Sequence, residues 1–399
     1  MIQASGIGAR ASLSHSRYDL PVTAPYRLDL TVSVLRRLST NLVDVLTENG
    51  EYVRALAVSG EPVIARVRQT RRDALAVTLD GDERVHARAL ALVRRMLGVD
   101  QDLAHFNRAV AAIPWLNSLA TRMRGVRPPR YPTLWEACVN AIVFQQVSLH
   151  AASAIMYRLI VALQPSVHSG GVSLYQFPTA ETVLHTDDHL LRAAGISSGK
   201  LATLRRVAEL LAAGTLGESI VEELESHDAA VLLRGIKGIG PWTAAVILLR
   251  GLGRLDVFPM NDTSVARNLV LVGGSGPLDV EGVLRALSPQ QGMLYYHLLL
   301  ARLESRNDLG RASASAASNV RQSMAKTTFK VGEHVSWNSE AGRVSGTIVR
   351  VHTTNVEFKG YTHHASKDEP QYEIKSDKTD HIAMHKGSAL RRKKARRAV

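Results

Sequence analysis

The sequence contains little of several residue types that would define a structural class. There is one cysteine in 399 residues, Cys138, which excludes an intramolecular disulfide framework and any four-cysteine zinc or iron–sulfur site. No apolar run reaches the roughly 18 residues that a membrane-spanning helix needs, and the first twenty residues lack the apolar stretch of a secretory signal. We therefore expect a soluble protein of a reducing, cytoplasmic compartment, with no membrane partner.

Charge of one sign is present in excess. Lys and Arg number 49 against 36 Asp and Glu, which gives a formal net charge of +13, and the 45% of hydrophobic residues can build sizeable cores. Most of the excess lies in residues 306–399, which carry 18 basic and 9 acidic side chains, six of the basic ones in the final RRKKARRAV. Because basic surfaces attract polyanions, nucleic acid is the first partner to test.

The hydrophobic pattern predicts an α+β protein of several domains. After a polar leader, residues 1–24, residues 25–101 read as an antiparallel subdomain. Here YRLDLTVSVL, EYVRALAV, PVIARVRQ and ALAVTLD alternate apolar and polar side chains before a helical stretch at about 83–97. Residues 102–304 are apolar at helical spacing almost throughout, with a break near Val147–Ser148. This region is therefore predicted to be an all-α domain.

The composition changes twice more toward the C-terminus. Residues 305–327 are small and polar without periodicity, which indicates a flexible linker. Residues 328–390 contain short runs such as FKVGEHVSWN, GRVSGTIVRVHT and PQYEIKSD, bounded by Gly, Asn and Asp, as in a small β-barrel. Residues 391–399 read as a basic tail.

The most informative segment is LLRGIKGIGPWTAAVILLRGLGRLDVFPMND, Leu232–Asp262. One helix is expected to end at Gly235, and Pro241 then opens the next helix at its first position, where a missing N–H costs nothing. The intervening turn, Gly238–Gly240, allows close approach of the backbone to a ligand and directs unpaired N–H groups outward. This geometry suits a phosphate group whatever the base. A tight helix–helix turn around a buried Ile239 is the alternative interpretation.

The same segment resembles the helix-hairpin-helix motif of the HhH-GPD superfamily of DNA glycosylases. In that family an Asp at the mouth of the base pocket follows the turn by about twenty residues, and Asp262 occupies that position. The resemblance includes LWEACVNAIVFQQVS, GISSGKLATLRRVA and GMLYYHLLLARLE, so that it covers about residues 102–304. The sheet-then-helices layout resembles the alkylpurine branch. The resemblance implies a bacterial, nucleoid-associated enzyme that excises bases such as 3-methyladenine and 7-methylguanine from damaged double-stranded DNA.

Asp262 would supply the chemistry that the resemblance implies. Cleavage of an N-glycosidic bond builds positive charge on the sugar, and one carboxylate near C1′ can stabilise that charge and orient or deprotonate the attacking water. Asp256 is the nearest rival, but it precedes the apolar VFPM and is expected to be structural. Asp262-Thr-Ser can also be read as a helix cap, so this alternative stays open.

Position 242 predicts the type of reaction. Glycosylases of this superfamily that also cut the strand carry a Lys two residues after the second hairpin glycine, and here that residue is Trp242. Without an amine to form a Schiff base, we expect simple hydrolysis that leaves an abasic site. The missing cysteine cluster excludes the iron–sulfur branch of the superfamily, and no cofactor is expected to be required.

Base excision requires the base to leave the helix, so the enzyme needs a wedge and an aromatic pocket. The break in FQQVS, residues 144–148, matches the wedge loop of the family, and Gln145 and Gln146 are the candidates. Gln146 is expected to fill the vacated stack, whereas a glutamine pair that satisfies loop backbone is the alternative. The aromatic candidates for the pocket are Trp242 first, then Tyr296, Tyr295, Phe144 and Trp135, although aromatics at helical spacing are commonly core residues.

The resemblance also assigns backbone groups of the hairpin. The residues expected at the DNA phosphate are Gly238, Ile239, Gly240 and Thr243. A monovalent cation, Na⁺ or K⁺, would be held there by the carbonyls of Arg234, Ile236 and Ile239.

Residues 329–390 resemble the hypervirulence-associated Tudor-like domain through FKVGEHVSWNSEAGRVSGTI and YTHHASKDEPQYEIKSDKTDHIAMHKGSAL. The resemblance implies a small β-barrel but no ligand, so the partner of this module stays unknown. His363–His364 and the pair His381 and His385 could suggest a metal site, but no Cys or clear ligand set accompanies them. We expect binding-module histidines instead. Of the aromatic residues Trp337, Tyr361 and Tyr372, two are expected to be core.

Two other functions remain compatible with the sequence. The same fold could remove a deaminated or oxidised base. Alternatively, a non-catalytic hairpin protein could bind lesions without cutting the glycosidic bond.

Overall fold

The computed structural model describes most of the chain, namely residues 13–260, 262–273, 278–313, 329–339, 342–358, 361–363, 365, 370–377 and 382–392. The chain divides between Ser313 and Ala314 into two compact units. Each unit has a hydrophobic core of its own. Among the described residues, no helix is long and apolar enough to cross a membrane.

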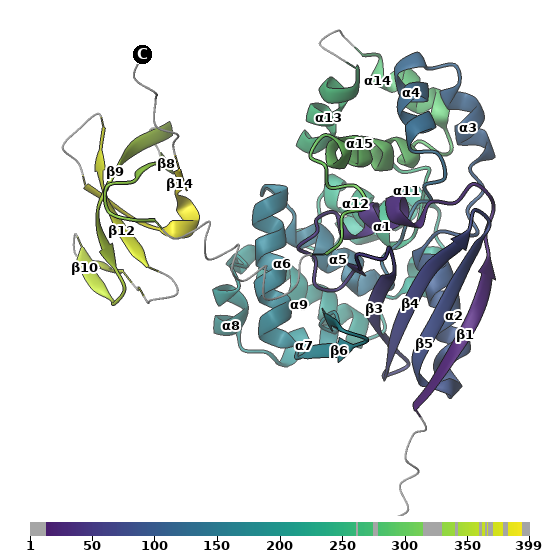
Figure 1. Ribbon diagram of the computed structural model, residues 1–399, viewed down its shortest axis with the longest axis horizontal. Coiled ribbons are helices and arrows are strands. Elements are labelled where there is room, and N and C mark those ends of the chain that lie inside the picture. Colours follow the sequence, from purple (N-terminus) through teal and green to yellow (C-terminus); the bar gives the residue numbers. More distant parts are fainter. Residues whose placement is uncertain are drawn as a thin grey trace, which may run out of the picture. The chain divides into compact units, whose positions relative to one another are not determined.

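The first unit begins with a five-stranded antiparallel sheet of order β1-β5-β4-β3-β2 (Figure 1). Its strands are β1 (Leu13–Pro21), β2 (Val45–Leu46), β3 (Tyr52–Val58), β4 (Glu61–Arg71) and β5 (Ala74–Asp82). The strands predicted from EYVRALAV, PVIARVRQ and ALAVTLD are confirmed as β3, β4 and β5. The short 3₁₀ turn Glu83–Val85 leads into helix α2 (His86–Met96), which packs against the sheet, so the predicted helical stretch is confirmed as well.

The strand predicted from YRLDLTVSVL is wrong, because this segment forms helix α1 (Leu28–Arg36). The alternation of apolar and polar residues misled the prediction since the polar residues are buried too. Thr31 accepts a hydrogen bond from the Arg127 amide, and the Ser33 hydroxyl donates to the Asp29 carbonyl within the helix. A helix that is buried on nearly all sides does not show the 3.6-residue period of a surface helix.

The polar leader is also shorter than predicted. Residues 13–21 form β1, an edge strand whose full length pairs with β5. Its side chains alternate between exposed positions and half-buried or buried ones, and His15 reaches Asp80 across the ladder. Because an edge strand with one covered face needs few apolar residues, its composition resembled that of a leader.

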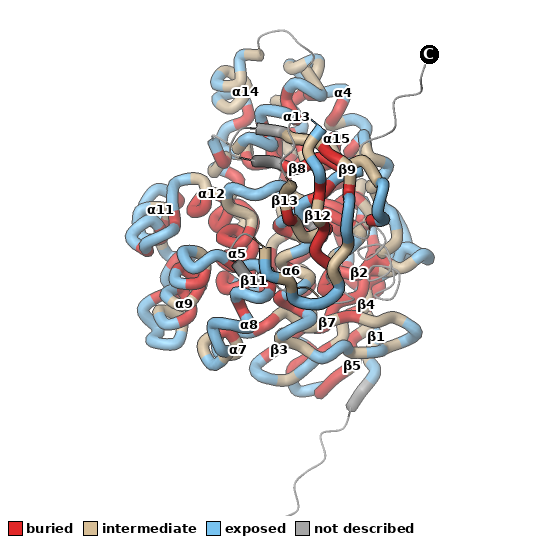
Figure 2. Tube along the Cα trace, turned by 90° about the vertical axis from the view of Figure 1, so that its left-hand side faces the viewer, coloured by how far each residue is buried: buried red, intermediate tan, exposed pale blue. Residues whose placement is uncertain are grey.

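The remainder of the first unit is helical, as predicted for residues 102–304. The helices are α3 (Ala104–Val110), α4 (Pro114–Arg122), α5 (Leu134–Val143), α6 (Leu149–Leu163), α7 (Ala180–His185), α8 (Asp188–Ala193), α9 (Ser198–Ala212), α10 (Glu218–Glu222), α11 (Ser226–Arg234), α12 (Pro241–Gly251), α13 (Thr263–Gly273), α14 (Val280–Leu287) and α15 (Gly292–Glu304). All ten residues of α5 are buried, and its trace is red throughout in Figure 2. Helix α5 packs against α12 and α9, so these helices form the centre of the domain.

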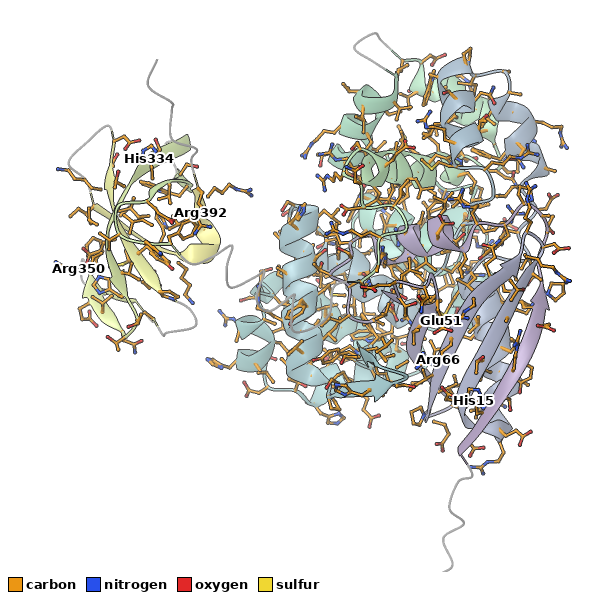
Figure 3. The ribbon with its side chains drawn as sticks, in the orientation of Figure 1. His15, Glu51, Arg66, His334, Arg350 and Arg392 are labelled. Atoms are coloured by element: carbon orange, nitrogen blue, oxygen red, sulfur yellow. The ribbon has the colours of Figure 1, made fainter. Side chains whose placement is uncertain are left out.

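A small hairpin interrupts the helices where none was predicted. Strands β6 (Ser166–Ser169) and β7 (Val172–Tyr175) pair with each other, and β7 lies against β3 of the sheet. Arg66 of β4 donates to the Ser169 hydroxyl at 2.8 Å and lies 3.2 Å from Glu51 (Figure 3). The arginine therefore fastens the hairpin to the sheet.

The predicted linker begins later than residue 305. Residues 305–313, which we call the strap, belong to the first unit. The Gly310 amide donates to the Ser33 hydroxyl at 3.0 Å, and the Ser313 amide donates to the Leu46 carbonyl at 2.7 Å. Composition alone does not indicate this packing, because the contacts of the strap are mainly made by backbone groups.

The second unit is a small sheet structure of order β13-β12-β9-β8-β14, with a separate β10-β11 hairpin. Its strands are β8 (His334–Ser339), β9 (Gly342–His352), β10 (Val356–Phe358), β11 (Tyr361–His363), β12 (Gln371–Ser376), β13 (Ile382–Lys386) and β14 (Arg391–Arg392). Trp337 and Tyr372 are core residues, as expected for two of the three aromatics. The side chain of Tyr361 lies outside the described residues, as do those of His363, His364 and His381. The first two residues of the predicted basic tail form β14.

Candidate active site

The hairpin turn adopts the predicted geometry. Helix α11 ends at Arg234 with Gly235 as its C-cap, and α12 begins with Pro241 at its first position and Gly240 as its N-cap. Gly238 has a φ of +96°, and a Cβ at this position would lie 2.0 Å from the Thr203 hydroxyl oxygen. Only glycine can satisfy both constraints, so the turn depends on the first glycine of the motif.

Two amides of the turn are available to a ligand. Among the described residues, the N–H groups of Gly238 and Gly240 have no hydrogen-bond partner, and both glycines are exposed. The Ile239 amide instead donates to the Ile236 carbonyl at 3.0 Å, and the Ile239 side chain is buried. A phosphate contact is therefore expected at the amides of the two glycines. The buried side chain of Ile239 stabilises the turn, in agreement with the alternative interpretation of this segment.

Thr243 is buried, and its hydroxyl accepts a hydrogen bond from Gln145 Nε2 at 2.8 Å. The phosphate contact expected of Thr243 therefore stays a prediction for its backbone amide. The hydroxyl is instead part of the connection between the hairpin and the wedge loop.

Asp262 uses both carboxylate oxygens. Oδ1 accepts from the Ser264 amide at 2.7 Å, the Ser264 hydroxyl at 2.5 Å and the Val265 amide at 3.3 Å, so Asp262 caps α13. Oδ2 accepts from the indole N–H of Trp242 at 2.9 Å. The helix cap that was the alternative interpretation of Asp262 is therefore present. It uses only Oδ1, and Oδ2 is directed toward α12.

The Trp242–Asp262 hydrogen bond joins the two principal residues of the sequence prediction. Trp242 lies in the first turn of α12, directly after the glycine turn, and its side chain is half-buried. Asp262 is half-buried as well, so the carboxylate keeps access to solvent. The rival Asp256 is exposed, and its backbone carbonyl accepts from Gln291. Nothing in the sequence signalled the indole–carboxylate bond, since the two residues are twenty positions apart.

The wedge loop separates its two glutamines. Gln145 Nε2 donates to the Gly238 carbonyl at 2.9 Å as well as to Thr243, so this glutamine satisfies backbone and does not project as a wedge. Gln146 is exposed and has a φ of +53°, which is uncommon for a residue other than glycine. Of the two candidates, Gln146 alone retains a side chain that faces solvent.

A lysine that the prediction missed holds the base of this loop. Lys200 Nζ donates to the Val143 carbonyl at 2.9 Å and to the Gln145 carbonyl at 2.8 Å. These carbonyls belong to the C-terminal end of α5, where a cation stabilises the unpaired backbone oxygens. Partial burial lowers the pKa of this amine below its ordinary value.

Most of the remaining aromatic candidates are core residues. Tyr296 is fully buried, and its hydroxyl donates to the Leu249 carbonyl at 3.0 Å, so the prediction that it faces a base pocket is wrong. Tyr295 packs edge-on against Tyr296, and the indole N–H of Trp135 donates to the Pro178 carbonyl. Helical spacing cannot distinguish a pocket aromatic from a core aromatic, which is why these residues were proposed.

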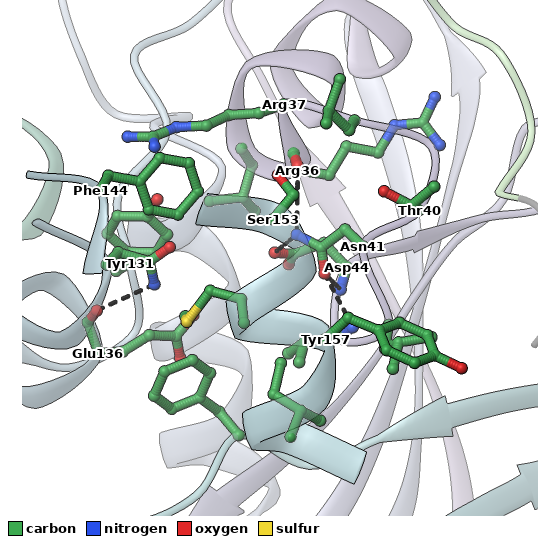
Figure 4. Close-up of a pocket in the computed structure, with 18 residues that line it drawn as sticks. Arg36, Arg37, Thr40, Asn41, Asp44, Tyr131, Glu136, Phe144, Ser153 and Tyr157 are labelled. Atoms are coloured by element: carbon green, nitrogen blue, oxygen red, sulfur yellow. Dashed lines mark hydrogen bonds between the residues drawn. The ribbon is translucent and has the colours of Figure 1, made fainter. Parts of the chain in front are cut away.

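Phe144 lines a small cavity of about 40 Å³ beside the wedge loop, between α5, α6 and the segment that follows α1 (Figure 4). The guanidinium carbon of Arg37 lies 4.4 Å from the centre of the Phe144 ring. Arg37 is 8% exposed, has a φ of +62°, and its Nε has no partner among the described residues. The arginine therefore covers one face of the ring that was predicted to stack on a base.

The wall of this cavity contains a buried charge cluster. Arg54 donates to Asp44 and to Glu136, and the Tyr52 hydroxyl donates to Asp44 at 2.8 Å. Arg54 and both acids are at most 3% exposed. Burial raises the pKa of Glu136 to about 7, and Arg54 opposes that effect. The cluster joins β3 to the first turn of α5.

Among the described residues, no group of three or more His, Cys, Asp or Glu side chains could hold a metal ion. Cys138 is buried, and burial raises the pKa of its thiol to about 12, so it is not a nucleophile.

Three domain models match the chain in order. Residues 17–132 match the AlkA N-terminal domain, residues 139–288 match the HhH-GPD superfamily base excision DNA repair protein, and residues 332–390 match the TUDOR domain of hypervirulence-associated proteins. Residues 139–288 are thus similar to an HhH-GPD domain. Both resemblances drawn from the sequence are thereby confirmed.

Curated relatives align with a large part of this chain. The chain is 32% identical over 263 residues to the probable bifunctional transcriptional activator/DNA repair enzyme AlkA of Mycobacterium tuberculosis. This alignment covers 64% of this chain and 50% of that protein. It is 28% identical over 248 residues to DNA-3-methyladenine glycosylase 2 of Escherichia coli, which covers 61% of this chain and 84% of that protein. The chain thus spans half the length of the first of these relatives.

Solved structures agree on the fold. A 3-methyladenine DNA-glycosylase from Archaeoglobus fulgidus superposes with a TM-score of 0.61 and 23% identity, over 72% of this chain and 99% of that chain. A Clostridium acetobutylicum 8-oxoguanine glycosylase/lyase in complex with DNA gives a TM-score of 0.56 at 13% identity, over 73% of this chain and 98% of that chain. At these identities the comparison shows the shared fold of sheet and helices.

Proposed function

We propose that this protein is a monofunctional DNA N-glycosylase that hydrolyses the bond between deoxyribose and an alkylated purine, such as 3-methyladenine or 7-methylguanine. Its product would be an abasic site in double-stranded DNA. The observation that carries the proposal is the Asp262 carboxylate, which the α13 cap and the Trp242 indole hold at the end of the hairpin. The name of the E. coli relative supports the alkylpurine substrate, and that of the M. tuberculosis relative supports a role in DNA repair.

In the proposed mechanism Asp262 acts electrostatically. As the glycosidic bond lengthens, positive charge grows on the sugar, and a fixed carboxylate lowers the energy of that state. The cap bonds and the indole bond orient the carboxylate before substrate arrives, so that no reorganisation is needed during the reaction. The same carboxylate can accept a proton from the attacking water.

The leaving base needs little help. A methylated purine such as 7-methylguanine is cationic, so it departs without a protein acid. Trp242 can stack on such a base, and a cation over an indole face gains roughly 0.5–2 kcal/mol. The same residue occupies the position of the lysine in bifunctional glycosylases, so no covalent imine with the sugar is proposed. Borohydride trapping on abasic DNA should give no protein–DNA adduct, and an adduct would contradict this part of the proposal.

The proposal is tested by base release. Duplexes that contain 3-methyladenine, 7-methylguanine, hypoxanthine, uracil or 8-oxoguanine are incubated with the full-length protein, and the free base is measured. We expect the methylpurines to be released and 8-oxoguanine to be retained. Release of only a deaminated or oxidised base would contradict the alkylated purine as substrate and favour that base instead. Duplex binding without any base release would favour a non-catalytic lesion-binding protein.

The proposal includes a monovalent cation at the hairpin and no required cofactor. Among the described residues, the carbonyls of Arg234 and Ile239 have no hydrogen-bond partner, whereas that of Ile236 accepts from the Ile239 amide. Free carbonyl oxygens fit Na⁺ or K⁺, which would bring positive charge to the DNA phosphate. Duplex affinity should therefore be several-fold weaker in tetramethylammonium chloride than in KCl at equal ionic strength. Equal affinity in the two salts would contradict the cation.

A further inference from the structure

Two consecutive arginines stand at the end of α1, and they differ in their partners. Arg36 is the last residue of the helix and Arg37 is its C-cap. Arg36 donates to the Ser313 hydroxyl at 3.2 Å and to the Arg311 carbonyl, so the strap holds its guanidinium. The guanidinium of Arg37 has no hydrogen bond and no ion pair among the described residues. Within the described part of the chain, the fold thus leaves the charge of Arg37 without a partner.

The backbone fixes the position of the Arg37 side chain. Its φ of +62° is a conformation that costs energy for a residue with a Cβ. The Arg37 amide donates to the Ser33 carbonyl at 3.0 Å, which holds this conformation at the end of α1. The side chain then extends over the Phe144 ring, with the guanidinium carbon 4.4 Å from the ring centre (Figure 4). The cation is therefore held in one place by a capped helix end and an aromatic platform.

The Arg37 guanidinium is buried on one side and open on the other. The residue is 8% exposed overall, and its Nε is buried without a partner. The two terminal nitrogens, Nη1 and Nη2, are not buried in this way, so they keep contact with solvent. These nitrogens carry the planar N–H fork that binds a phosphate or a carboxylate through two parallel hydrogen bonds.

The cavity beside Phe144 supplies no carboxylate for Arg37. Its wall contains Asp44 and Glu136, but Arg54 binds both of these acids. A mostly buried cation without a partner costs free energy, because protein atoms replace part of its water shell. An anion from outside the chain would supply the missing partner.

The wedge loop lies directly beside this cation. Phe144, on which Arg37 stacks, is followed by Gln145, which is tied to the hairpin, and by Gln146, the exposed wedge candidate. A duplex that receives Gln146 therefore brings its backbone to the same part of the surface. Since the anions of DNA are its phosphates, a phosphate is the ligand that this arrangement fits.

We propose that Arg37 is a DNA-positioning residue, which binds one phosphate of the duplex beside the wedge loop with the Phe144 ring as its platform. That DNA is the partner rests on the proposed function. Because the cation is mostly buried, the contact requires close approach of the DNA backbone, which occurs when the wedge enters the duplex and a base leaves the stack. Arg37 therefore stabilises the distorted complex more than the complex with undamaged DNA.

The test compares Arg37→Met and Arg37→Lys with the wild type in the full-length protein. Methionine keeps apolar packing on Phe144 without the charge, whereas lysine keeps the charge without the planar fork. Arg17→Met is the matched control, because Arg17 is exposed on β1 and has no ion pair among the described residues. Binding is measured by anisotropy on a duplex with a tetrahydrofuran abasic site, and on the same duplex without it, from about 50 to 300 mM KCl.

At about 150 mM KCl we expect Arg37→Met to bind the tetrahydrofuran duplex about tenfold more weakly, and the undamaged duplex less than about threefold more weakly. On the tetrahydrofuran duplex, the slope of log K against the logarithm of the KCl concentration should become shallower by about 0.9, the value for one phosphate. Arg37→Lys should restore the slope and only part of the affinity. Arg17→Met should match the wild type on both duplexes.

Two results would overturn the proposal. The first is equal affinity of the wild type and Arg37→Met for the tetrahydrofuran duplex. The second is weaker binding with an unchanged salt slope, which would assign the contact to an uncharged group of the DNA or to the packing of the loop.

Thermal stability separates the proposed role from a structural one. Because the charge has no partner in the free protein, Arg37→Met should melt at the wild-type temperature or above it. A lower melting temperature with an unchanged salt slope would show that Arg37 serves the packing of Phe144, and would contradict the phosphate contact.

Failure of this inference is distinguishable from failure of the proposed function. Binding to an abasic analogue requires no base release, so a wild type that releases no methylpurine would contradict the glycosylase and leave the Arg37 comparison intact. Conversely, methylpurine release by the wild type together with unchanged affinity of Arg37→Met would contradict this inference alone.

Discussion

The first unit contains two acidic sites that differ in almost every respect. Asp262 is half-buried, caps α13 and accepts from an indole, and no cation pairs with it among the described residues. Glu136 is 3% exposed and shares the single positive charge of Arg54 with Asp44. Neutral donors orient Asp262 but leave its charge uncompensated, whereas Glu136 is paired directly with an arginine. The first arrangement suits catalysis, and the second joins the sheet to the helices.

This difference explains why the two carboxylates should respond differently to substitution. An amide in place of Asp262 keeps one accepting oxygen for the α13 cap but loses the charge and the bond from the Trp242 indole, so chemistry should suffer while the fold does not. Removal of a member of the buried cluster leaves an opposite charge without a partner in a water-poor site, which destabilises the fold.

The largest effect is expected for Asp262→Asn, which should lower single-turnover methylpurine release by at least about a thousandfold. Asparagine is as good an N-cap as aspartate, so the free energy of unfolding should change by less than about 1 kcal/mol. Asp256→Asn, at an exposed position, is the control and should retain full activity. A D262N protein with wild-type rate would remove Asp262 from the mechanism.

Arg54→Met should lower the free energy of unfolding by about 3–5 kcal/mol, because it strands two buried acids. Urea denaturation measures the change, and Arg68→Met on the exposed side of β4 should cost less than about 0.5 kcal/mol. The rate per folded molecule should stay close to that of the wild type. A decrease of less than about 1 kcal/mol would show that the cluster is more hydrated than its burial indicates.

Trp242→Phe should have an intermediate effect on rate. The aromatic ring remains for stacking, but the hydrogen bond to Asp262 Oδ2 is removed, and a bond to a charged group contributes about 1.5–3 kcal/mol. We expect single-turnover release to fall by about tenfold. If Trp242→Leu is no slower than Trp242→Phe, the ring contributes only its hydrogen bond and no stacking.

The stability of the fold should also depend on pH. Burial raises the pKa of Glu136 to about 7, while that of an unfolded Glu is about 4.3. Between these values the folded chain holds a proton that the unfolded chain has released, so the stability contributed by Glu136 falls as the pH rises.

The difference in unfolding free energy between the wild type and Glu136→Gln isolates this effect. The stability of the wild type relative to Glu136→Gln should decrease by up to about 1.4 kcal/mol per pH unit from about pH 4.5 to 7. Above about pH 7 the difference should become constant. Taking the difference matters because burial lowers the pKa of His297 to about 4, which makes stability rise with pH in the same range. A flat difference curve would show that Arg54 keeps Glu136 ionised throughout.

The sequence was most informative where backbone geometry admits few residues. Glycines and Pro241 predicted the hairpin because Gly238 needs a positive φ and a missing Cβ. It was least informative where burial, not periodicity, determined the structure. Helix α1 shows no clear 3.6-residue hydrophobic period, because its polar residues Thr31 and Ser33 are buried as well. Tyr296 has the spacing expected of a pocket residue but lies in the core. Interactions between distant segments, such as Trp242 with Asp262, leave no local pattern.

The attachment of the wedge loop also has a kinetic consequence. Gln145 is tied to the hairpin and its carbonyl to Lys200, so the stem of the loop shares the rigidity of α9 and α12. On the proposed function, Gln146, whose left-handed backbone is already set, would enter the duplex by rotating its side chain about χ angles. Such rotations take nanoseconds or less, far faster than loop refolding. The lifetime of an extruded base should then be governed by the dynamics of the DNA.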